Sequence, residues 1–290
     1  MMGQGLLQYP LWNQKKMISV FGHSGFIGTH FCNKYSDEVI KIPREDRVPQ
    51  SEDILYLIST NTNYNVYKDA TLDVKTNLLV LLEVLQNFNP VQHTFNFVSS
   101  WFTYGTTKLP ATETSPCNPK GFYSITKKAA EDLLISFCRT FGVKYRIFRL
   151  ANVYGIGDNY SKEKNAFQYL LDKLYNNEEV KLYYGGEFVR DFIHVDDACG
   201  AMRHFMYFGE PNEIYNIGNG LPFNFGKLIK FCKEELNSSS KISTMEPTEF
   251  HNIVQVKDFW MNTDKLKSTG FVCRKDFHDF MLEYKRSKGK

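Results

Sequence analysis

Tyr123 and Lys127 are the residues of this sequence whose types and spacing best suit proton transfer. They stand four positions apart, so in a helix the phenol and the ammonium group share one face. A tyrosine with its ordinary pKa of about 10 is a poor base at neutral pH. A neighbouring lysine and a positively charged ring of a bound molecule would both lower that pKa. The pair could then move a proton to or from a substrate hydroxyl group.

The spacing alone does not select this pair, because the sequence holds six Tyr-x-x-x-Lys matches, which begin at Tyr64, Tyr104, Tyr123, Tyr160, Tyr169 and Tyr284. Only Tyr123 opens a long amphipathic helix pattern, residues 122–141, after a strand-like run that ends in Ser99-Ser100. The carboxyl ends of parallel strands are where open α/β sheets bind ligands. Ser100 could therefore share a hydrogen bond with a substrate oxygen; the alternative is a serine that only satisfies local hydrogen bonds.

A glycine-rich turn, Gly22-His23-Ser24-Gly25-Phe26-Ile27-Gly28, directly follows the apolar run 17–21 and opens a helix pattern. A strand that turns into a helix through glycines leaves backbone N–H groups at the helix N-terminus, which suit a pyrophosphate. The first glycine permits the tight turn, the second lets phosphates approach, and the third lets helix and strand pack closely. The alternative is a purely structural turn.

Strand and helix patterns alternate through the first two-thirds of the chain. Strands are predicted at 17–21, 38–42, 54–59, 94–99 and 143–150, and helices at 72–88 and 122–141. This alternation indicates an α/β fold with a doubly wound parallel sheet. We expect residues 17–150 to form a dinucleotide-binding core and 151–290 mainly a smaller lobe that binds substrate, with some segments returning to the core. Residues 1–16 are expected to be an extension, either disordered or introduced by cloning.

Composition narrows the class of protein. The 290 residues are 42% hydrophobic, which is enough for a sizeable core. The net charge of +3 gives no reason to expect nucleic acid or a membrane surface as a partner, and no apolar run reaches the roughly 18 residues of a membrane span. Six scattered cysteines without a C-x-x-C pair suit reduced thiols in the cytoplasm, and the histidines lack metal-ligand spacing, so we expect no metal.

Further segments strengthen the pattern: Phe97-Val98-Ser99-Ser100 with Tyr104-Gly105, Arg149-Leu150-Ala151-Asn152-Val153-Tyr154-Gly155, residues 190–197, and Tyr215-Asn216-Ile217-Gly218. With the glycine turn and the Tyr123–Lys127 pair, they resemble the extended short-chain dehydrogenase/reductase family, in particular its nucleotide-sugar epimerases, dehydratases and reductases. The resemblance covers residues 17–285 and implies a Rossmann-type fold.

The resemblance also implies roles for individual residues. Ser100, Tyr123 and Lys127 match the catalytic triad: Tyr123 would transfer the proton, Lys127 would lower its pKa and hold the nicotinamide ribose, and Ser100 would orient the sugar hydroxyl or ketone. Asn152 and Arg190 match positions that contact the sugar nucleotide. A guanidinium group meets phosphate oxygens in a fork, so Arg190 is expected at the diphosphate.

Three departures from the family pattern restrict the reaction. The dehydratases carry an Asp-Glu pair where this chain has Trp101 and Phe102, which disfavours 4,6-dehydration. The connection between the second strand and Ile54 is short, so an element is expected to be missing. Residues 251–256 lack an arginine that relatives use on the nucleotide. The activity that the resemblance implies is hydride exchange at C4 of a nucleotide-activated sugar, as a 4-epimerase or a 4-ketoreductase. The alternative is a non-catalytic NAD(P)-binding sensor or scaffold protein, which the intact triad of Ser100, Tyr123 and Lys127 disfavours.

The end of the second strand predicts the cofactor. NAD-preferring relatives usually place Asp there, whereas this chain has Pro43-Arg44. Arg44 can meet a 2′-phosphate with charge-assisted hydrogen bonds; the alternative is a solvated loop residue paired with Glu45 or Asp46. We therefore expect NADP rather than NAD, with Ser24 and Ser59 among the residues that contact it.

Two smaller expectations concern helices. The helices at 72–88 and 122–141 are apolar on two faces, which predicts a homodimer with a four-helix interface. His194 and Asp196-Asp197 are interpreted as a helix entry with an aspartate cap rather than as a site.

Overall fold

The computed structural model describes residues 16–89, 94–157 and 166–289, so all but the last residue of the extension expected at 1–16 lies outside the described residues. Six strands form one parallel sheet in the order β10-β5-β4-β3-β1-β2. Their bounds are β1 (Ile18–Phe21), β2 (Val39–Ile42), β3 (Asp53–Tyr56), β4 (Thr94–Ser100), β5 (Lys144–Leu150) and β10 (Glu213–Ile217). The central strands β1, β3, β4 and β5 are buried almost throughout because helices cover both faces of the sheet. The predicted doubly wound α/β sheet is confirmed.

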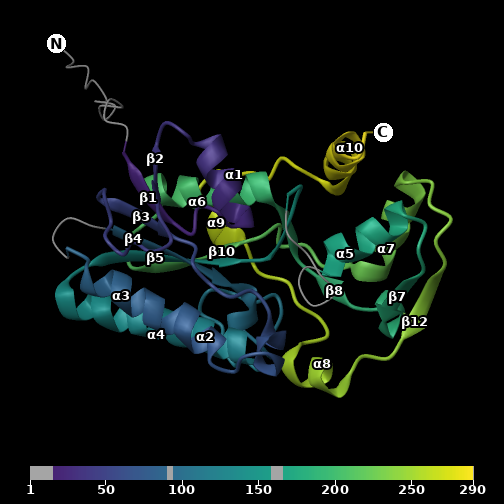
Figure 1. Ribbon diagram of the computed structural model, residues 1–290, viewed down its shortest axis with the longest axis horizontal. Helices are drawn as coiled ribbons and strands as arrows, with labels where there is room; N and C mark the ends of the chain where they lie inside the picture. The colour runs from purple at the N-terminus through teal and green to yellow at the C-terminus, as the bar shows by residue number, and fades with distance from the viewer. Residues whose placement is uncertain (1–15, 90–93, 158–165, 290) are drawn as a thin grey trace, which may run out of the picture.

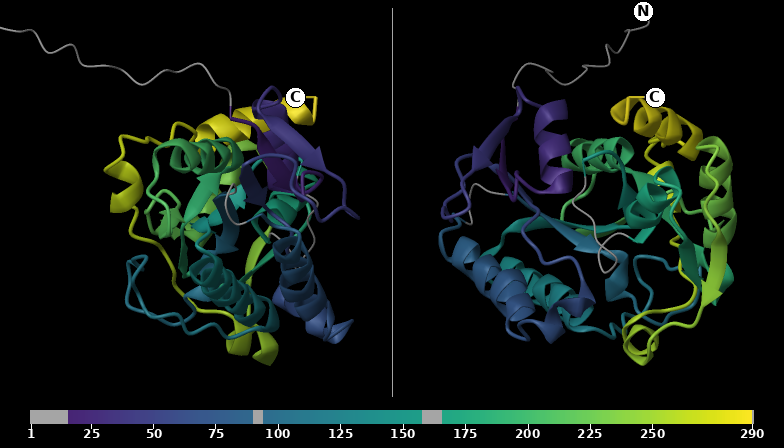
Figure 2. Two further views of the ribbon diagram at one scale, coloured as in Figure 1. Left: turned by 90° about the vertical axis from the view of Figure 1, so that its left-hand side faces the viewer. Right: turned by 45° about the vertical axis from the view of Figure 1, so that its right-hand side comes forward.

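Helices cover the sheet in two layers (Figure 1). One layer holds α1 (Phe26–Lys34) and α6 (Val195–Phe208), and the other holds α4 (Phe122–Phe141) and the helix at 72–86. Figure 2 shows the same layers from two other sides. The helix at 72–86 is not regular: α2 (Leu72–Val74) passes through a π-helical turn, η2 (Lys75–Leu79), into α3 (Val80–Gln86). The connection between β2 and β3 holds no helix, as expected from its length.

The later part of the chain forms a second group of elements beside the sheet (Figure 1). Three two-stranded sheets pair β11 with β8, β12 with β7, and β6 with β9. Their bounds, with those of the remaining helices, are η1 (Asn63–Tyr67), η3 (Trp101–Thr103), β6 (Asn152–Tyr154), α5 (Ala166–Tyr175), β7 (Val180–Tyr183), η4 (Tyr184–Gly186), β8 (Val189–Arg190), β9 (Phe192–His194), β11 (Phe223–Asn224), α7 (Phe225–Glu235), β12 (Ile242–Met245), α8 (Glu249–Val254), α9 (Asp264–Lys267) and α10 (Phe277–Ser287). A separate aromatic core, which includes Tyr154, Phe167 and Phe280, holds this group together.

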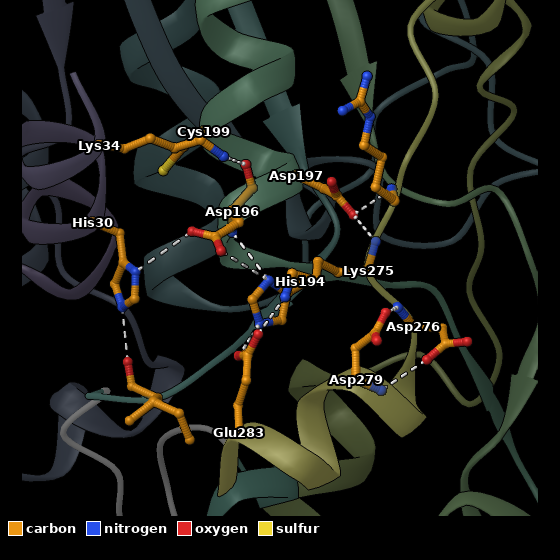
Figure 3. A network of polar contacts seen from close by, with 12 residues as sticks. His30, Lys34, His194, Asp196, Asp197, Cys199, Lys275, Asp276, Asp279 and Glu283 are labelled. Carbon is orange, nitrogen blue, oxygen red and sulfur yellow. Dashed lines mark hydrogen bonds and ion pairs between the residues drawn. The ribbon is translucent and has the colours of Figure 1, made fainter. Parts of the chain in front are cut away.

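The start of α6 differs from the sequence prediction (Figure 3). The N-cap is His194, whose Nδ1 accepts the Asp196 N–H at 3.2 Å, so the predicted aspartate cap is wrong. The helix begins at Val195, which places both aspartates in its first turn, where they favour the helix dipole. Asp197 instead accepts the N–H groups of Arg274 at 3.0 Å and Lys275 at 2.8 Å, which ties α6 to the segment that leads into α10.

One face of α4 is polar and yet buried against β4 and β5. Tyr123, Lys127 and Glu131 follow one another at four-residue spacing on this face, and all three are buried. The Lys127 Nζ donates to the Val98 carbonyl at 2.7 Å. Glu131 accepts from Arg149 through both oxygens, at 3.0 and 2.7 Å. Because an unpaired buried charge is costly, these contacts specify how α4 lies on the sheet.

The buried ammonium group of Lys127 makes stability depend on pH. Burial lowers its pKa from 10.5 to about 7, against the opposing charge of Glu131. Between these values the unfolded chain binds a proton that the folded protein does not, so the stability of the wild type rises with pH. Lys127→Met should remove this slope, which is at most about 1.4 kcal/mol per pH unit. Urea unfolding of both proteins across this range measures the difference.

The matched control is Lys144→Met, which removes an exposed lysine at the start of β5. Its unfolding free energy should follow the wild type in parallel at every pH. A constant difference between the wild type and Lys127→Met would contradict the prediction.

Candidate active site

A cavity of about 900 Å³ lies between the sheet and the second group of elements. Its lining brings together residues far apart in the sequence, among them Tyr123, Asn152 and Arg190. Aromatic side chains supply much of the wall, including Trp101, Phe102 and several from β7 to β9. A largely apolar cavity with a few polar groups is typical of a small-molecule site.

Tyr123 lies in the first turn of α4, where the helix start is well defined. The Ser124 hydroxyl accepts the N–H of the N-cap residue Gly121 at 2.9 Å. Ser100 ends β4, and its Oγ accepts the Phe102 N–H at 3.3 Å. Burial raises the pKa of Tyr123, and the nearby Asp73 adds to this, whereas hydrogen bonds from Ser100 and Ser59 lower it. The structure therefore brings Ser100, Ser59 and Tyr123 together around one phenol.

Lys127 lies near these residues, between α4 and β4. Its ammonium group lies 4.1 Å from the centre of the Phe97 ring and donates to the Val98 carbonyl. Val98 stands two residues before Ser100 on β4. The lysine is thus buried one helical turn from Tyr123 and does not line the cavity itself.

The glycine turn has the geometry that an anion site needs. Gly22 has a φ of +81°, which other residues rarely adopt. A Cβ on Gly28 would lie 2.3 Å from the Gly22 carbonyl oxygen, so this position requires glycine. No side chain caps Gly25 at the start of α1, and Ser24 and Gly25 are exposed. The turn and the N–H groups that follow, at Phe26 and Ile27, could hold a phosphate.

Beside Tyr123 lies a polar network that sequence reasoning missed, apart from Ser59. Asn77, in the π-helical turn, accepts from the Thr60 N–H at 2.9 Å and donates to Thr60 Oγ1 and Thr126 Oγ1, each at 2.9 Å. The Ser59 hydroxyl donates to Asn77 at 3.1 Å, and Thr60 also donates to Asp73. No sequence signal marks Asp73 or Asn77, because in a regular helix both would read as surface positions.

Two buried oxygens here have no hydrogen-bond donor among the described residues. They are Oδ2 of Asp73 and Oδ1 of Asn63, whose residue also lines the cavity. Buried acceptors are nearly always satisfied in folded proteins. Of the two, Asn63 lines the cavity, where a bound molecule could supply the missing donor.

Arg190 is held as a partly buried cation at the cavity wall. Its guanidinium group donates to the backbone carbonyls of Val189 at 2.9 Å and Val256 at 2.8 Å, and to that of Lys257. Burial lowers the pKa of Arg190 to about 10, against the charge of Asp258. No carboxylate among the described residues forms a direct ion pair with it. Three contacts leave two of the five guanidinium N–H donors for an anion.

Asn152 lines the cavity, whereas Arg44 lies outside it, beyond the end of β2. The Asn152 side chain donates to the Asp191 carbonyl at 2.8 Å and lines the cavity near Arg190. Arg44 is exposed just beyond β2, whose last residue Ile42 is paired with Phe21 before the glycine turn. The structure gives the Arg44 side chain no ion pair within the described ranges, whereas its neighbour Arg47 binds Glu83 at 2.7 Å.

The described part of the chain offers neither a metal site nor a membrane span. No three His, Cys, Asp or Glu side chains among those residues stand close enough to hold a metal ion. None of their helices combines the length and apolar character that crossing a bilayer needs.

Comparisons with known proteins agree with this geometry. The sequence profile of the NAD dependent epimerase/dehydratase family matches residues 50–218, more than half of the chain. A Methanocaldococcus jannaschii protein named as a candidate UDP-glucose 4-epimerase is 25% identical, over 88% of this chain and 92% of that protein. The dTDP-4-dehydro-6-deoxyglucose reductase of Escherichia coli is 25% identical, over 63% of this chain and 57% of that protein.

Solved structures show the same relationship. UDP-glucose 4-epimerase from Thermotoga maritima, crystallised with UDP-glucose, superimposes with a TM-score of 0.82 at 25% identity, covering 94% of this chain and 99% of that chain. The resemblance to extended short-chain dehydrogenases/reductases is thereby confirmed. The chain belongs to the NAD-dependent epimerase/dehydratase family, whose members include nucleotide-sugar epimerases, dehydratases and reductases.

Proposed function

We propose that this protein exchanges hydride with C4 of a nucleotide sugar, as a 4-epimerase or a 4-ketoreductase. The observation that carries the proposal is the shared cavity: a phenol supported by two serine hydroxyls on one side, and an arginine without a carboxylate partner on the other. A sugar diphosphate supplies an oxygen for Tyr123 and negative charge for Arg190. In this proposal residues 17–150 hold the cofactor and 151–290 mainly hold the substrate.

The residues present fit a nicotinamide dinucleotide. The glycine turn offers uncapped backbone N–H groups to a pyrophosphate, and the buried Oδ1 of Asn63, a residue that lines the cavity, has no hydrogen-bond donor among the described residues. Related folds have been crystallised with NAD, in a UDP-glucose 4-epimerase from Thermus thermophilus, and with NADPH, in RMD from Pseudomonas aeruginosa. A bound nicotinamide would accept or supply the hydride.

The chain's own residues would manage the proton and the orientation of the sugar. Tyr123 transfers the proton at O4, and Ser100 holds the same oxygen. Lys127 supports the phenolate electrostatically when its ammonium group is charged. Asn152 and Arg190 hold the sugar nucleotide. Trp101 and Phe102 offer no acid or base, so water elimination is not part of the activity.

Isotope transfer tests the proposal and separates its two forms. Cofactor deuterated at the nicotinamide C4 is incubated with a panel of nucleotide sugars and 4-ketosugars. A 4-ketoreductase moves deuterium into the sugar with net oxidation of the cofactor, whereas a 4-epimerase inverts C4 without net cofactor turnover. Cofactor binding without either reaction would contradict the proposal and favour a non-catalytic sensor.

Tyr123→Phe should remove nearly all turnover and leave cofactor affinity nearly intact. Only the phenolic oxygen and its proton are lost, while the ring keeps its packing against Phe102. The expected loss in kcat is about 10²–10⁴-fold. Tyr284→Phe is the control, because this tyrosine also begins a Tyr-x-x-x-Lys match but bonds Asp172 outside the cavity. More than about a tenth of wild-type kcat in Tyr123→Phe would show that another group transfers the proton.

We propose a preference for NADP over NAD, set by Arg44. The exposed guanidinium group can bind a 2′-phosphate that NAD lacks. Arg44→Ala should weaken NADP binding by about tenfold or more, as expected for a charge-assisted contact, and leave NAD binding nearly unchanged. Fluorescence titration of both cofactors measures this, with Lys41→Ala, an exposed cation of β2, as control. Tighter binding of NAD to the wild type would overturn the assignment.

We also propose a homodimer that buries the outer faces of α3 and α4. Exposed apolar side chains follow this surface, namely Leu79, Leu82, Phe122, Ile125, Leu133 and Phe141. Burying them against a two-fold copy is favourable. Sedimentation at micromolar concentration should show twice the 33.7 kDa chain mass, and Ile125→Glu should shift it to the monomer. Val272→Glu, at an exposed residue elsewhere, should not; a monomeric wild type would refute the dimer.

A further inference from the structure

His251 is a cavity-lining histidine to which the proposed function gives no role. It lies on α8, and its ring centre is 4.5 Å from that of Tyr183 on β7. Its Nδ1 lies 3.5 Å from the hydroxyl oxygen of Tyr64 on η1. Among the described residues, Tyr64 is the only hydrogen-bond partner of the ring. Two aromatic neighbours therefore position the imidazole, and its Nε2 is left without a described partner.

His251 and Arg190 are connected through the chain segment that follows α8. The Gln255 N–H donates to the His251 carbonyl at 3.0 Å, one turn along the helix. The next two carbonyls, of Val256 and Lys257, accept from the Arg190 guanidinium group. Both side chains line the same cavity, and the charge of Arg190 acts on the imidazole. An anion bound at Arg190 acts on the imidazole too, with the opposite sign.

The free protein keeps the His251 imidazole neutral at neutral pH. Burial, together with the positive charge of Arg190, lowers the pKa of His251 to about 4. The other elements that contact the ring present the aromatic side chains of Tyr64 and Tyr183 rather than charged groups. Of the described charges, Arg190 alone contributes to the shift. The remaining charged side chains that line the cavity are Lys173, Glu179, Lys181 and Lys257.

We propose that His251 binds the substrate diphosphate together with Arg190, and that it takes up a proton from solvent when the diphosphate binds. Both ring nitrogens then carry N–H groups, so that Nε2 donates to a phosphate oxygen and Nδ1 to the Tyr64 hydroxyl oxygen, which can accept as well as donate. A charged histidine would thus serve in a segment, 251–256, that has no arginine. This inference rests on the proposed function and describes how that site holds its anion.

The coupling makes affinity depend on pH with a definite sign. An anion within about 4–6 Å raises the pKa of such a group by about 1–3. A rise of about two would place the pKa of His251 near 6 in the complex. Because the complex then binds more protons than the free protein, affinity should increase as pH falls, by about tenfold between pH 8 and pH 5.

Calorimetry with the full-length protein tests the coupling. The probes are the glucose diphosphates of uridine, thymidine, guanosine and cytidine, together with any nucleotide sugar that accepts deuterium in the isotope experiment. Each phosphate in them is a diester, which lacks the second ionisation near pH 6 of a phosphate monoester, so the diphosphate itself takes up no proton in this range. Binding heats in two buffers of different ionisation enthalpy should show uptake of about half a proton at pH 6 and almost none at pH 8.

His251→Gln assigns the proton to this residue, because glutamine forms hydrogen bonds and cannot become charged. The variant should lose the tenfold increase toward pH 5, while any dependence due to Asp191 or Lys127 remains. The control is His278→Gln, which removes an exposed histidine of α10, 71% exposed and 3.9 Å from Glu235, and should follow the wild type at every pH. In histidine-selective NMR, the signal that His251→Gln removes should titrate below pH 5 in the free protein and near pH 6 in the complex.

The outcomes for the inference and for the proposed function are distinct. If a probe binds and the His251 signal titrates at the same pH with and without it, or if His251→Gln keeps the wild-type pH dependence, the inference is wrong and the proposed function stands. If no probe binds at any pH and no deuterium is transferred to any sugar, both fail.

Discussion

The buried polar face of α4 is the constraint on which the candidate site depends. Two charged side chains, Lys127 and Glu131, enter the interior on consecutive turns, and each must find its partner on the sheet. The partners are a carbonyl of β4 and the guanidinium group of Arg149 on β5. Because breaking either contact leaves a polar or charged group buried, α4 has one favourable position on these strands. Tyr123, one turn before Lys127, is thereby placed at the end of β4 beside Ser100.

A second buried acid, Asp191, organises the opposite wall of the cavity. Its carboxylate accepts the N–H groups of Asn219 and Gly220, each at 3.1 Å, and that of Met261 at 3.3 Å. Burial raises its pKa to about 7 although these donors lower it. Its backbone carbonyl accepts from Asn152, and its neighbour in sequence is Arg190. One residue, next to Arg190 in the chain, thus holds together three segments at this end of the cavity.

The cavity lies between α4 and the segments that Asp191 holds, and the surroundings of Tyr123 differ from those of Arg190. Near Tyr123 lies the polar network of Ser59, Thr60, Asn77 and Asp73. Within it, Oδ2 of Asp73 has no hydrogen-bond donor among the described residues. Near Arg190, a positive charge is surrounded by rings and backbone carbonyls. Phe102 packs against Tyr123, and Trp101, stacked on Phe102, lies 5.5 Å from the Arg190 guanidinium carbon. The cavity thus has polar groups around a phenol at one end and a guanidinium group at the other.

The sequence by itself determined the features that depend on neighbouring residues. Apolar runs identified the strands, glycine spacing identified the turn before α1, and the four-residue spacing of Tyr123 and Lys127 identified their common face, because each is a property of local backbone geometry. The irregular turn at Lys75–Leu79 and the histidine cap of α6 were not predicted, since tertiary contacts decide between closely similar local conformations.

Only the tertiary structure decided which distant groups meet. Nothing in the sequence indicates that Arg190 binds carbonyls more than sixty residues away, that Asp73 approaches Tyr123, or that the Trp101 ring lies beside the Arg190 guanidinium group. Such contacts follow from the packing of whole elements and leave no periodic trace along the chain. The physical reason is that burial and pairing of polar groups are settled by neighbours in space, which only the folded chain supplies.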